Sequence, residues 1–181
     1  AHPQEAPKPD VALIVSSVPA AIAGTFTTNV FKAAPVVHAT TALKAAGPNA
    51  RVRAILTNSG CANAVTGQQG LEDTQTLVNR VQALLSPRNQ NAIPTYEQDA
   101  RSSSTDVLMM STGVIGVRLP VAHIQRCLEH LAAPSILQSH PDAWLEAARA
   151  YMTTDTFPKI RTRQFIPVSY THLTLPTILL V

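Results

Sequence analysis

The sequence has little charge, few cysteines and no long apolar run, and each lack excludes a class of protein. Charged residues make up 14% of the 181 residues and the formal net charge is +3, which excludes a charge-driven disordered segment and a basic nucleic-acid-binding arm. No apolar run approaches the roughly 18 residues of a membrane-spanning helix. The two cysteines, Cys61 and Cys127, cannot build a disulfide scaffold. Because the chain has neither a CxxC pair nor an HExxH motif, no metal site is expected.

The rest of the composition is typical of a globular protein with one domain. Hydrophobic residues make up 45% of the chain, and 181 residues are enough to bury a core. Short apolar segments predict buried strands at 10–16, 51–58 and 106–112. The segment 25–31 is β-branched and aromatic, and it is a candidate for a further strand.

Apolar residues at helical spacing predict three helices. The first covers 71–85 and ends before Pro87. The second opens at Pro120 and has an apolar face formed by Val121, Ile124, Leu128 and Leu131. The third begins near Ser139, and the residues expected to face the core are Trp144, Leu145, Ala148 and Met152. Strands that alternate with helices predict an α/β fold, and the polar segment 86–105 is expected to be an exposed loop.

Two glycine-containing loops follow predicted strands: glycine loop 1 (residues 58–67) and glycine loop 2 (residues 111–116). Neither contains a P-loop or a GxGxxG motif, so nucleotide binding has little support. A glycine after a strand lets the backbone approach a ligand, and such loops can point N–H groups at a developing oxyanion. The Thr112 hydroxyl and the Gly113 amide are therefore a candidate pair of oxyanion donors. An ordinary strand-to-helix turn is the alternative.

A third polar cluster, at residues 152–159, follows the last predicted helix. Thr153 or Thr154 is a candidate to hydrogen-bond a polar substrate, and Asp155 is a candidate to orient an amine. The alternative is a Thr/Asp turn that ends the helix. Lys159 is expected to lie on the solvated face of a strand.

Four segments of the chain, in this order, resemble one known family. They are residues 26–36, 58–67, 111–116 and 147–159. They resemble the ornithine acetyltransferases, also called bifunctional glutamate N-acetyltransferases of arginine biosynthesis, and the resemblance runs from about Asp10 to about Phe165. Cys61 and the polar segment 86–105 look most like the fungal mitochondrial branch.

The resemblance implies an α/β sandwich and an acetyl-transfer mechanism. Members of the family are precursors that cut themselves before a threonine, giving an α chain and a β chain. The new N-terminal threonine of the β chain is the nucleophile and its own amine serves as base. It moves an acetyl group from N-acetylornithine to glutamate by a ping-pong route, and some members also use acetyl-CoA. No cofactor, nucleic acid or membrane is implied. The implied partner is a β chain from the same precursor, in a heterotetramer of two α and two β chains in the mitochondrial matrix.

The resemblance also implies roles for three residues. Thr112 and Gly113 match the Thr-Gly of the family's oxyanion hole, in agreement with the backbone argument above. Thr153 matches the first threonine of the family's Met-Thr-Thr-Asp-Thr motif, which binds substrate. No catalytic role is assigned to glycine loop 1, which is expected to shape the site.

The chain departs from the family pattern after Lys159. The family continues to Lys-Gly-x-Gly-Met and then to Asn-Met-Ala-Thr, with the cut before that threonine, and neither segment follows here. We therefore expect residues 1–165 to be part of an α-chain domain, incomplete without the β half, and residues 166–181 to be a non-native tail. The nucleophile and the family's substrate-binding lysine are then outside this chain, which is expected to be inactive alone. The alternative is a non-catalytic scaffold that pairs with a β chain.

Overall fold

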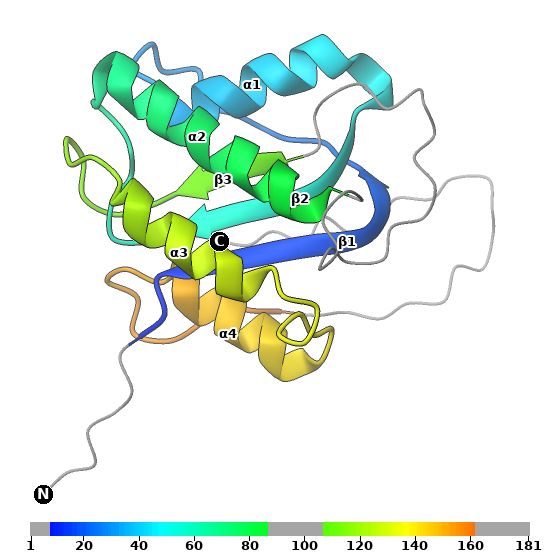
Figure 1. The fold of residues 1–181 in the computed structure, drawn as a ribbon. Helices are drawn as coiled ribbons and strands as arrows, with labels where there is room; N and C mark the ends of the chain where they lie inside the picture. Colours follow the sequence, from blue (N-terminus) through cyan, green and yellow to red (C-terminus); the bar gives the residue numbers. More distant parts are fainter. Residues whose placement is uncertain (1–7, 87–106, 162–181) are drawn as a thin grey trace, which may run out of the picture.

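The computed structural model describes residues 8–86 and 107–161 of the chain. Within them, the elements follow in the order β1 (Val11–Ala21), α1 (Ala34–Ala46), a short 3-10 helix η1 (Gly47–Asn49), β2 (Arg51–Asn58), α2 (Gly67–Leu85), β3 (Val107–Ser111), α3 (Val121–Leu131) and α4 (Pro141–Tyr151) (Figure 1). This mixed arrangement confirms the predicted α/β class. The exposed loop expected at 86–105 and the tail expected at 166–181 lie almost entirely outside the described residues.

The three strands form one sheet in the order β1-β2-β3. β1 runs antiparallel to β2, with Ile14 opposite Ile55, and β3 runs parallel to β2, with Ser111 opposite Asn58. Because parallel strands end at the same edge of a sheet, glycine loops 1 and 2 leave that edge as neighbours. The sheet topology therefore brings together two loops that are distant in the sequence.

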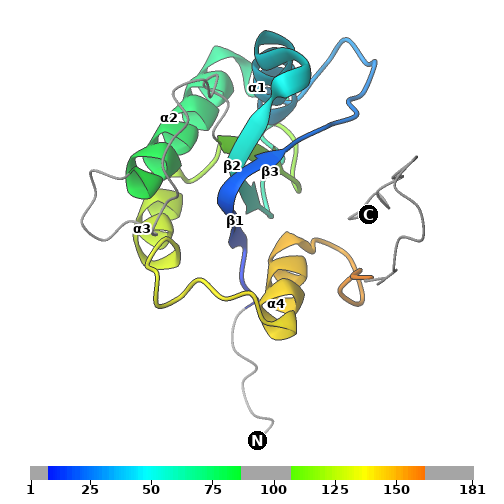
Figure 2. The ribbon, with the colours of Figure 1, turned by 90° about the vertical axis from the view of Figure 1, so that its right-hand side faces the viewer.

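One face of the sheet packs against α2 and α3 (Figure 2). The core on this face consists of Ala54 and Leu56 of β2, Val107 and Met109 of β3, Leu77, Val78, Val81 and Leu85 of α2, Ile124 and Leu128 of α3, and Leu119 just before α3. Alternation along the strands places every second side chain on this face. The apolar faces predicted for 71–85 and 121–131 are confirmed, because their central residues are the ones that are buried.

The opposite face of the sheet is covered in part by α4, which lies on the far side from α2 and α3 in Figure 2. Ile14 and Ile55 alternate with the core residues and point toward α4 and the segment after it, where they line a cavity. The helix begins at Pro141, and its N-cap is His140, whose ring nitrogen accepts the Asp142 N–H at 3.4 Å. The start expected near Ser139 is therefore correct to within two residues.

The strand predicted at 25–31 was wrong. Val30 and Phe31 are 94% and 76% exposed, and the segment has no strand. The Thr27 hydroxyl accepts the Asn29 N–H at 3.1 Å, and the Asn29 side chain accepts the Phe31 N–H at 2.9 Å. These local side-chain bonds occupy backbone groups that a sheet ladder would need.

Two further expectations were wrong, and one helix was missed. Trp144 was expected to face the core but is 47% exposed, and the buried residue of α4 is Ala150. Lys159 was expected on a strand, but no strand exists between 152 and 161. α1 was not predicted; it starts with Pro35 in its first turn and packs Ala39 against Val52 and Leu108.

Candidate functional site

The two glycine loops are joined to each other by backbone hydrogen bonds. The Val114 N–H donates to the Gly60 carbonyl at 2.9 Å, and the Ala62 N–H donates to the Val114 carbonyl at 2.9 Å. The Gly116 N–H donates to the Ala64 carbonyl at 2.8 Å. These bonds continue the parallel pairing of β2 and β3 beyond the strand ends, so the two loops form one ordered platform.

Gly113 can only be glycine in this platform. Its φ is +126°, a region that side chains with a Cβ rarely adopt. A Cβ added there would overlap the Gly60 carbonyl group and lie 2.8 Å from the Cys61 nitrogen. Glycine is therefore needed at this position for two reasons: the two loops approach each other closely there, and the backbone has a positive φ.

The candidate oxyanion donors have no competing acceptor. Among residues 8–86 and 107–161, neither the Gly113 N–H nor the Thr112 hydroxyl has a hydrogen-bond partner in the protein. The Thr112 N–H, by contrast, donates to the Asn58 carbonyl at 3.0 Å. The backbone on one side of the Thr112–Gly113 peptide is thus fixed, while the donors are free to bind a ligand oxygen.

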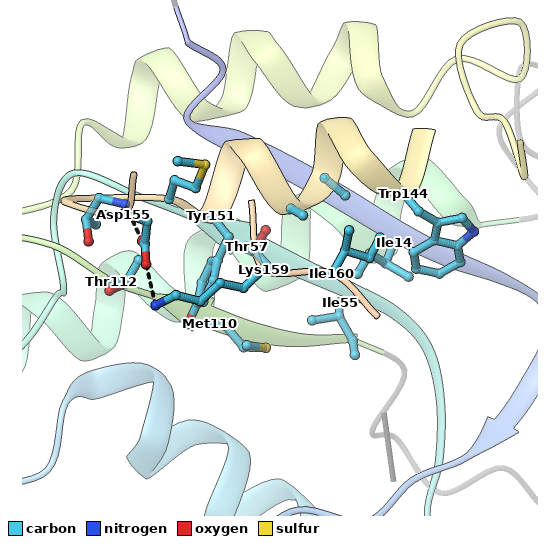
Figure 3. Close-up of a pocket in the computed structure, with 14 residues that line it drawn as sticks. Ile14, Ile55, Thr57, Met110, Thr112, Trp144, Tyr151, Asp155, Lys159 and Ile160 are labelled. Atoms are coloured by element: carbon cyan, nitrogen blue, oxygen red, sulfur yellow. Dashed lines mark hydrogen bonds and ion pairs between the residues drawn. The ribbon is translucent and has the colours of Figure 1, made fainter. Parts of the chain in front are cut away.

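A cavity of about 170 Å³ lies between the sheet, α4 and the segment 152–160. It is lined by Ile14, Ile55, Thr57, Met110, Thr112, Trp144, Ala147, Ala148, Tyr151, Met152, Thr153, Asp155, Lys159 and Ile160. Figure 3 shows Thr112, Asp155 and Lys159 near one end and Trp144 at the other, with Ile14 and Ile55 toward the Trp144 end. The cavity therefore has a polar end and an apolar end, and it brings together Thr112 and Thr153, two of the three residues singled out in the sequence. Gly113, the third, follows Thr112 directly but does not line this cavity.

The turn that carries Thr153 is held by Asp155. One oxygen of the Asp155 carboxylate accepts the Thr153 N–H at 3.2 Å, and the other accepts Lys159 Nζ at 2.7 Å. The Lys159 ammonium, followed by the Thr153 N–H, holds the pKa of Asp155 below its ordinary value. Asp155 is thus already paired with a cation of its own chain, and Thr154 is exposed and does not line the cavity.

Sequence reasoning missed two polar residues of the cavity. Tyr151 is half-buried in the last turn of α4, and burial raises the pKa of its hydroxyl. Thr57 lies on β2, two residues after Ile55, and its hydroxyl contacts the Ala12 carbonyl at 3.4 Å. The signal for Thr57 was the two-residue period of β2, which puts it on the face opposite Leu56.

The part of the chain that the structure describes has no group of three His, Cys, Asp or Glu residues able to hold a metal ion. None of its helices combines the length and the apolar character needed to cross a bilayer.

Curated proteins similar to this chain are considerably longer than it is. The mitochondrial arginine biosynthesis bifunctional protein ArgJ of Coprinopsis cinerea is 44% identical over an alignment of 162 residues, which covers 87% of this chain and 31% of that protein. The protein of the same name from Paracoccidioides brasiliensis is 45% identical over 165 residues, which are 91% of this chain and 32% of that protein. The chain thus spans about a third of the length of these relatives.

Solved structures show the same likeness in three dimensions. The ArgJ protein of Bacillus halodurans matches with a TM-score of 0.65 and 28% identity, over 81% of this chain and 65% of that one. The ornithine acetyltransferase of Mycobacterium tuberculosis, complexed with ornithine, matches with a TM-score of 0.66 and 35% identity, over 81% of this chain and 68% of that one. The model of the ArgJ family matches residues 2–177. The resemblance found in the sequence is confirmed: the chain belongs to the ArgJ family.

Proposed function

We propose that this chain is the α-chain portion of a glutamate N-acetyltransferase, which moves acetyl from N-acetylornithine to glutamate in arginine biosynthesis. The observation that carries the proposal is the meeting of Thr112 and Thr153 at one cavity, in a chain of the ArgJ family. The names of the relatives support the pathway, and their designation as mitochondrial supports a mitochondrial location for this chain.

The role of the two donors follows from the chemistry of acyl transfer. A hydroxyl nucleophile attacks the acetyl carbonyl carbon, and the π electrons move to the carbonyl oxygen, which becomes an oxyanion. The unpaired Gly113 N–H and Thr112 hydroxyl stabilise that charge by donating to it. Collapse of the intermediate expels the ornithine amine, which takes up a proton, and leaves an acetyl ester. The glutamate amine then attacks the ester carbonyl carbon, and the same two donors stabilise the second oxyanion. Its collapse breaks the ester C–O bond, and the nucleophile regains its hydroxyl proton as the attacking amine loses one, which releases N-acetylglutamate.

The cavity suits an acetylated amino acid. Its apolar wall of Ile14, Ile55 and Met110 provides a surface for aliphatic carbons. Its polar end provides the Thr153 hydroxyl as a hydrogen-bonding group for the substrate. The relative that was solved in complex with ornithine supports a substrate of this kind.

The nucleophile in this proposal comes from a β chain made from the same precursor, in a heterotetramer of two α and two β chains. The relatives are about three times as long as the matched segment, which supports a further portion that completes the site. Exposed apolar side chains of the glycine loops supply surface for such a partner: Val65, Val114 and Ile115 are 59–64% accessible.

The test is an acetyl-transfer assay on the chain alone and on the chain assembled with the β portion of the Coprinopsis cinerea relative. The chain alone is expected to give no transfer above background, and the assembly is expected to acetylate glutamate. Thr112→Ala in the assembly should lower kcat by about 10²–10³-fold, the effect of losing one oxyanion donor, with KM little changed. Transfer by the isolated chain would refute the need for a β chain.

The scaffold alternative makes a different prediction for the assemblies. If the chain is a non-catalytic scaffold that only pairs with a β chain, Thr112→Ala will assemble normally, and neither it nor the parent will support acetylation of the β chain. Size-exclusion chromatography of both assemblies provides the control, because it separates failed pairing from failed chemistry.

A further inference from the structure

The beginning of α2 holds both glycine loops through two consecutive residues. Thr74 holds glycine loop 1: its hydroxyl accepts the Asn63 side-chain amide at 2.8 Å, and the same amide group donates to the Gly70 carbonyl at 3.0 Å. Asn63 is fully buried and has a φ of +49°, so its side chain and backbone are both fixed. Asp73, the preceding residue, contacts the segment after glycine loop 2.

Asp73 is a buried carboxylate that Arg118 neutralises. Its residue exposure is 5%, and its two oxygens accept Arg118 Nη2 at 2.8 Å and Nε at 3.1 Å. This fork geometry fixes both the distance and the plane of the guanidinium. The hydrogen bond with Asp73 also raises the pKa of Arg118 above its already high ordinary value, so the guanidinium stays charged. Arg118 lies two residues after Gly116, the last residue of glycine loop 2.

We propose that Asp73 is a positioning residue for acetyl transfer, which acts through Arg118 to fix the loop that carries Thr112 and Gly113. The inference rests on the proposed function and names a further residue of the same site. Oxyanion donors act only when they lie about 2.7–3.1 Å from the position the charged oxygen takes. A small displacement of glycine loop 2 therefore weakens binding of the transition state and leaves ground-state binding of the substrate unchanged.

The geometry favours this pair over the other ion pair of α2. Arg80 and Glu129 join α2 to α3 at 2.7 Å, but both side chains are exposed and neither is near the glycine loops in the sequence. Exposed pairs of this type add little to stability. The Arg80–Glu129 pair is thus a matched control for loss of an ion pair on the same helix.

The experiment compares Asp73→Asn, Arg118→Lys and their double variant with Glu129→Gln, all in the assembled enzyme. Asp73→Asn and Arg118→Lys are each expected to lower kcat about tenfold, with KM for N-acetylornithine changed less than twofold. The double variant should lose no more than the worse single variant, because the two residues act as one unit. Glu129→Gln should match the parent.

The outcomes separate this inference from the proposed function. Parent-like kcat in Arg118→Lys, with Thr112→Ala strongly impaired, would overturn the positioning role and leave the proposed function intact. A parent rate in Thr112→Ala would remove the proposed function itself, and the inference with it. If Asp73→Asn fails to fold, Arg118→Lys decides, because the arginine side chain is 56% exposed and its replacement leaves the core intact. A fall in melting temperature without a fall in kcat would show a purely structural role and overturn the inference.

Discussion

Replacement of Gly113 by alanine tests whether the two glycine loops form one rigid unit. The new methyl group would overlap the Gly60 carbonyl, and φ would have to stay near +126°. Holding a side-chain-bearing residue in such a region costs about 1–3 kcal/mol. The overlap is relieved only if the loops separate, which weakens the Val114–Gly60 and Ala62–Val114 hydrogen bonds. Each is worth about 0.5–1.5 kcal/mol net.

The two contributions add to about 2–6 kcal/mol, which is a large part of the 5–15 kcal/mol that typically stabilises a domain. Urea denaturation of the chain, followed by far-ultraviolet circular dichroism, measures this loss as a fall in the transition midpoint at constant slope. Gly116→Ala is the matched control. Gly116 also has a positive φ, +79°, but nothing lies within 4 Å of a Cβ added there, so only the conformational cost applies.

The difference between the two variants isolates the close approach of the loops. Gly113→Ala should be less stable than Gly116→Ala by about 1–3 kcal/mol, the value of the two weakened hydrogen bonds. Equal stability of the two variants would refute the reasoning, since it would mean that the loops separate without energetic cost. The donors at Thr112 and Gly113 would then lack a rigid support.

Two further predictions concern the core and the turn that carries Thr153. Leu56 is fully buried, so Leu56→Ala should destabilise the chain by about 2–5 kcal/mol, while Ile55→Ala, on the half-buried cavity face, should cost less in the same urea titration. Lys159 and the Thr153 N–H hold the pKa of Asp155 below 3.8 in the folded chain. The ionised carboxylate therefore stabilises the fold at pH values above its pKa in the unfolded chain. This stabilisation is lost as the pH falls through its lower pKa in the folded chain. The difference in unfolding midpoint between the parent and Asp155→Asn should therefore be present at neutral pH and shrink below pH 3.8; a difference that stays constant down to low pH would contradict the assigned ion pair.

The helices and strands that were predicted correctly are those whose own residues show a clear apolar pattern. The helix over 71–85 has one apolar face, and burial follows that face. Its first turn, from Gly67 to Gly70, was not predicted, because it has no apolar residue and is fixed by the Asn63 side chain. The buried strands 51–58 and 106–112 were apparent for the same reason, since a continuous apolar segment needs cover on both faces.

The helix that was missed, α1, shows what a local sequence pattern cannot predict. α1 contains β-branched residues, which have low helix propensity. The helix is instead positioned by contacts with distant segments: the Ala34 N–H donates to the Asn63 carbonyl at 3.0 Å, and Ala39 packs on Val52 and Leu108. Such contacts exist only once the sheet has formed, so no window of the sequence contains them.

The candidate site was predictable in its parts but not in its assembly. Thr112 and Thr153 each follow an element that the sequence indicated. Nothing in the sequence says that α4 crosses the sheet face on which Thr112 lies, and it is this crossing that brings them to one cavity (Figure 3). The burial of Asp73 and its pairing with Arg118 could not be predicted, because an acidic residue on a helix is ordinarily solvated and Arg118 is remote in the sequence.

The platform formed by the two glycine loops is fixed more firmly than the turn that carries Thr153. Substitutions in the two places are therefore expected to change different kinetic constants. Thr112 and Gly113 lie on a platform fixed by backbone bonds between two loops and by buried side chains of α2. Thr153 lies in an exposed turn, held by one backbone hydrogen bond to Asp155 and by the ion pair of Asp155 with Lys159. Donors for a transition state must be in place before the charge develops, whereas a group that binds the ground state can adjust to its ligand. Changes to the platform should therefore lower kcat, and changes to the Thr153 turn should raise KM.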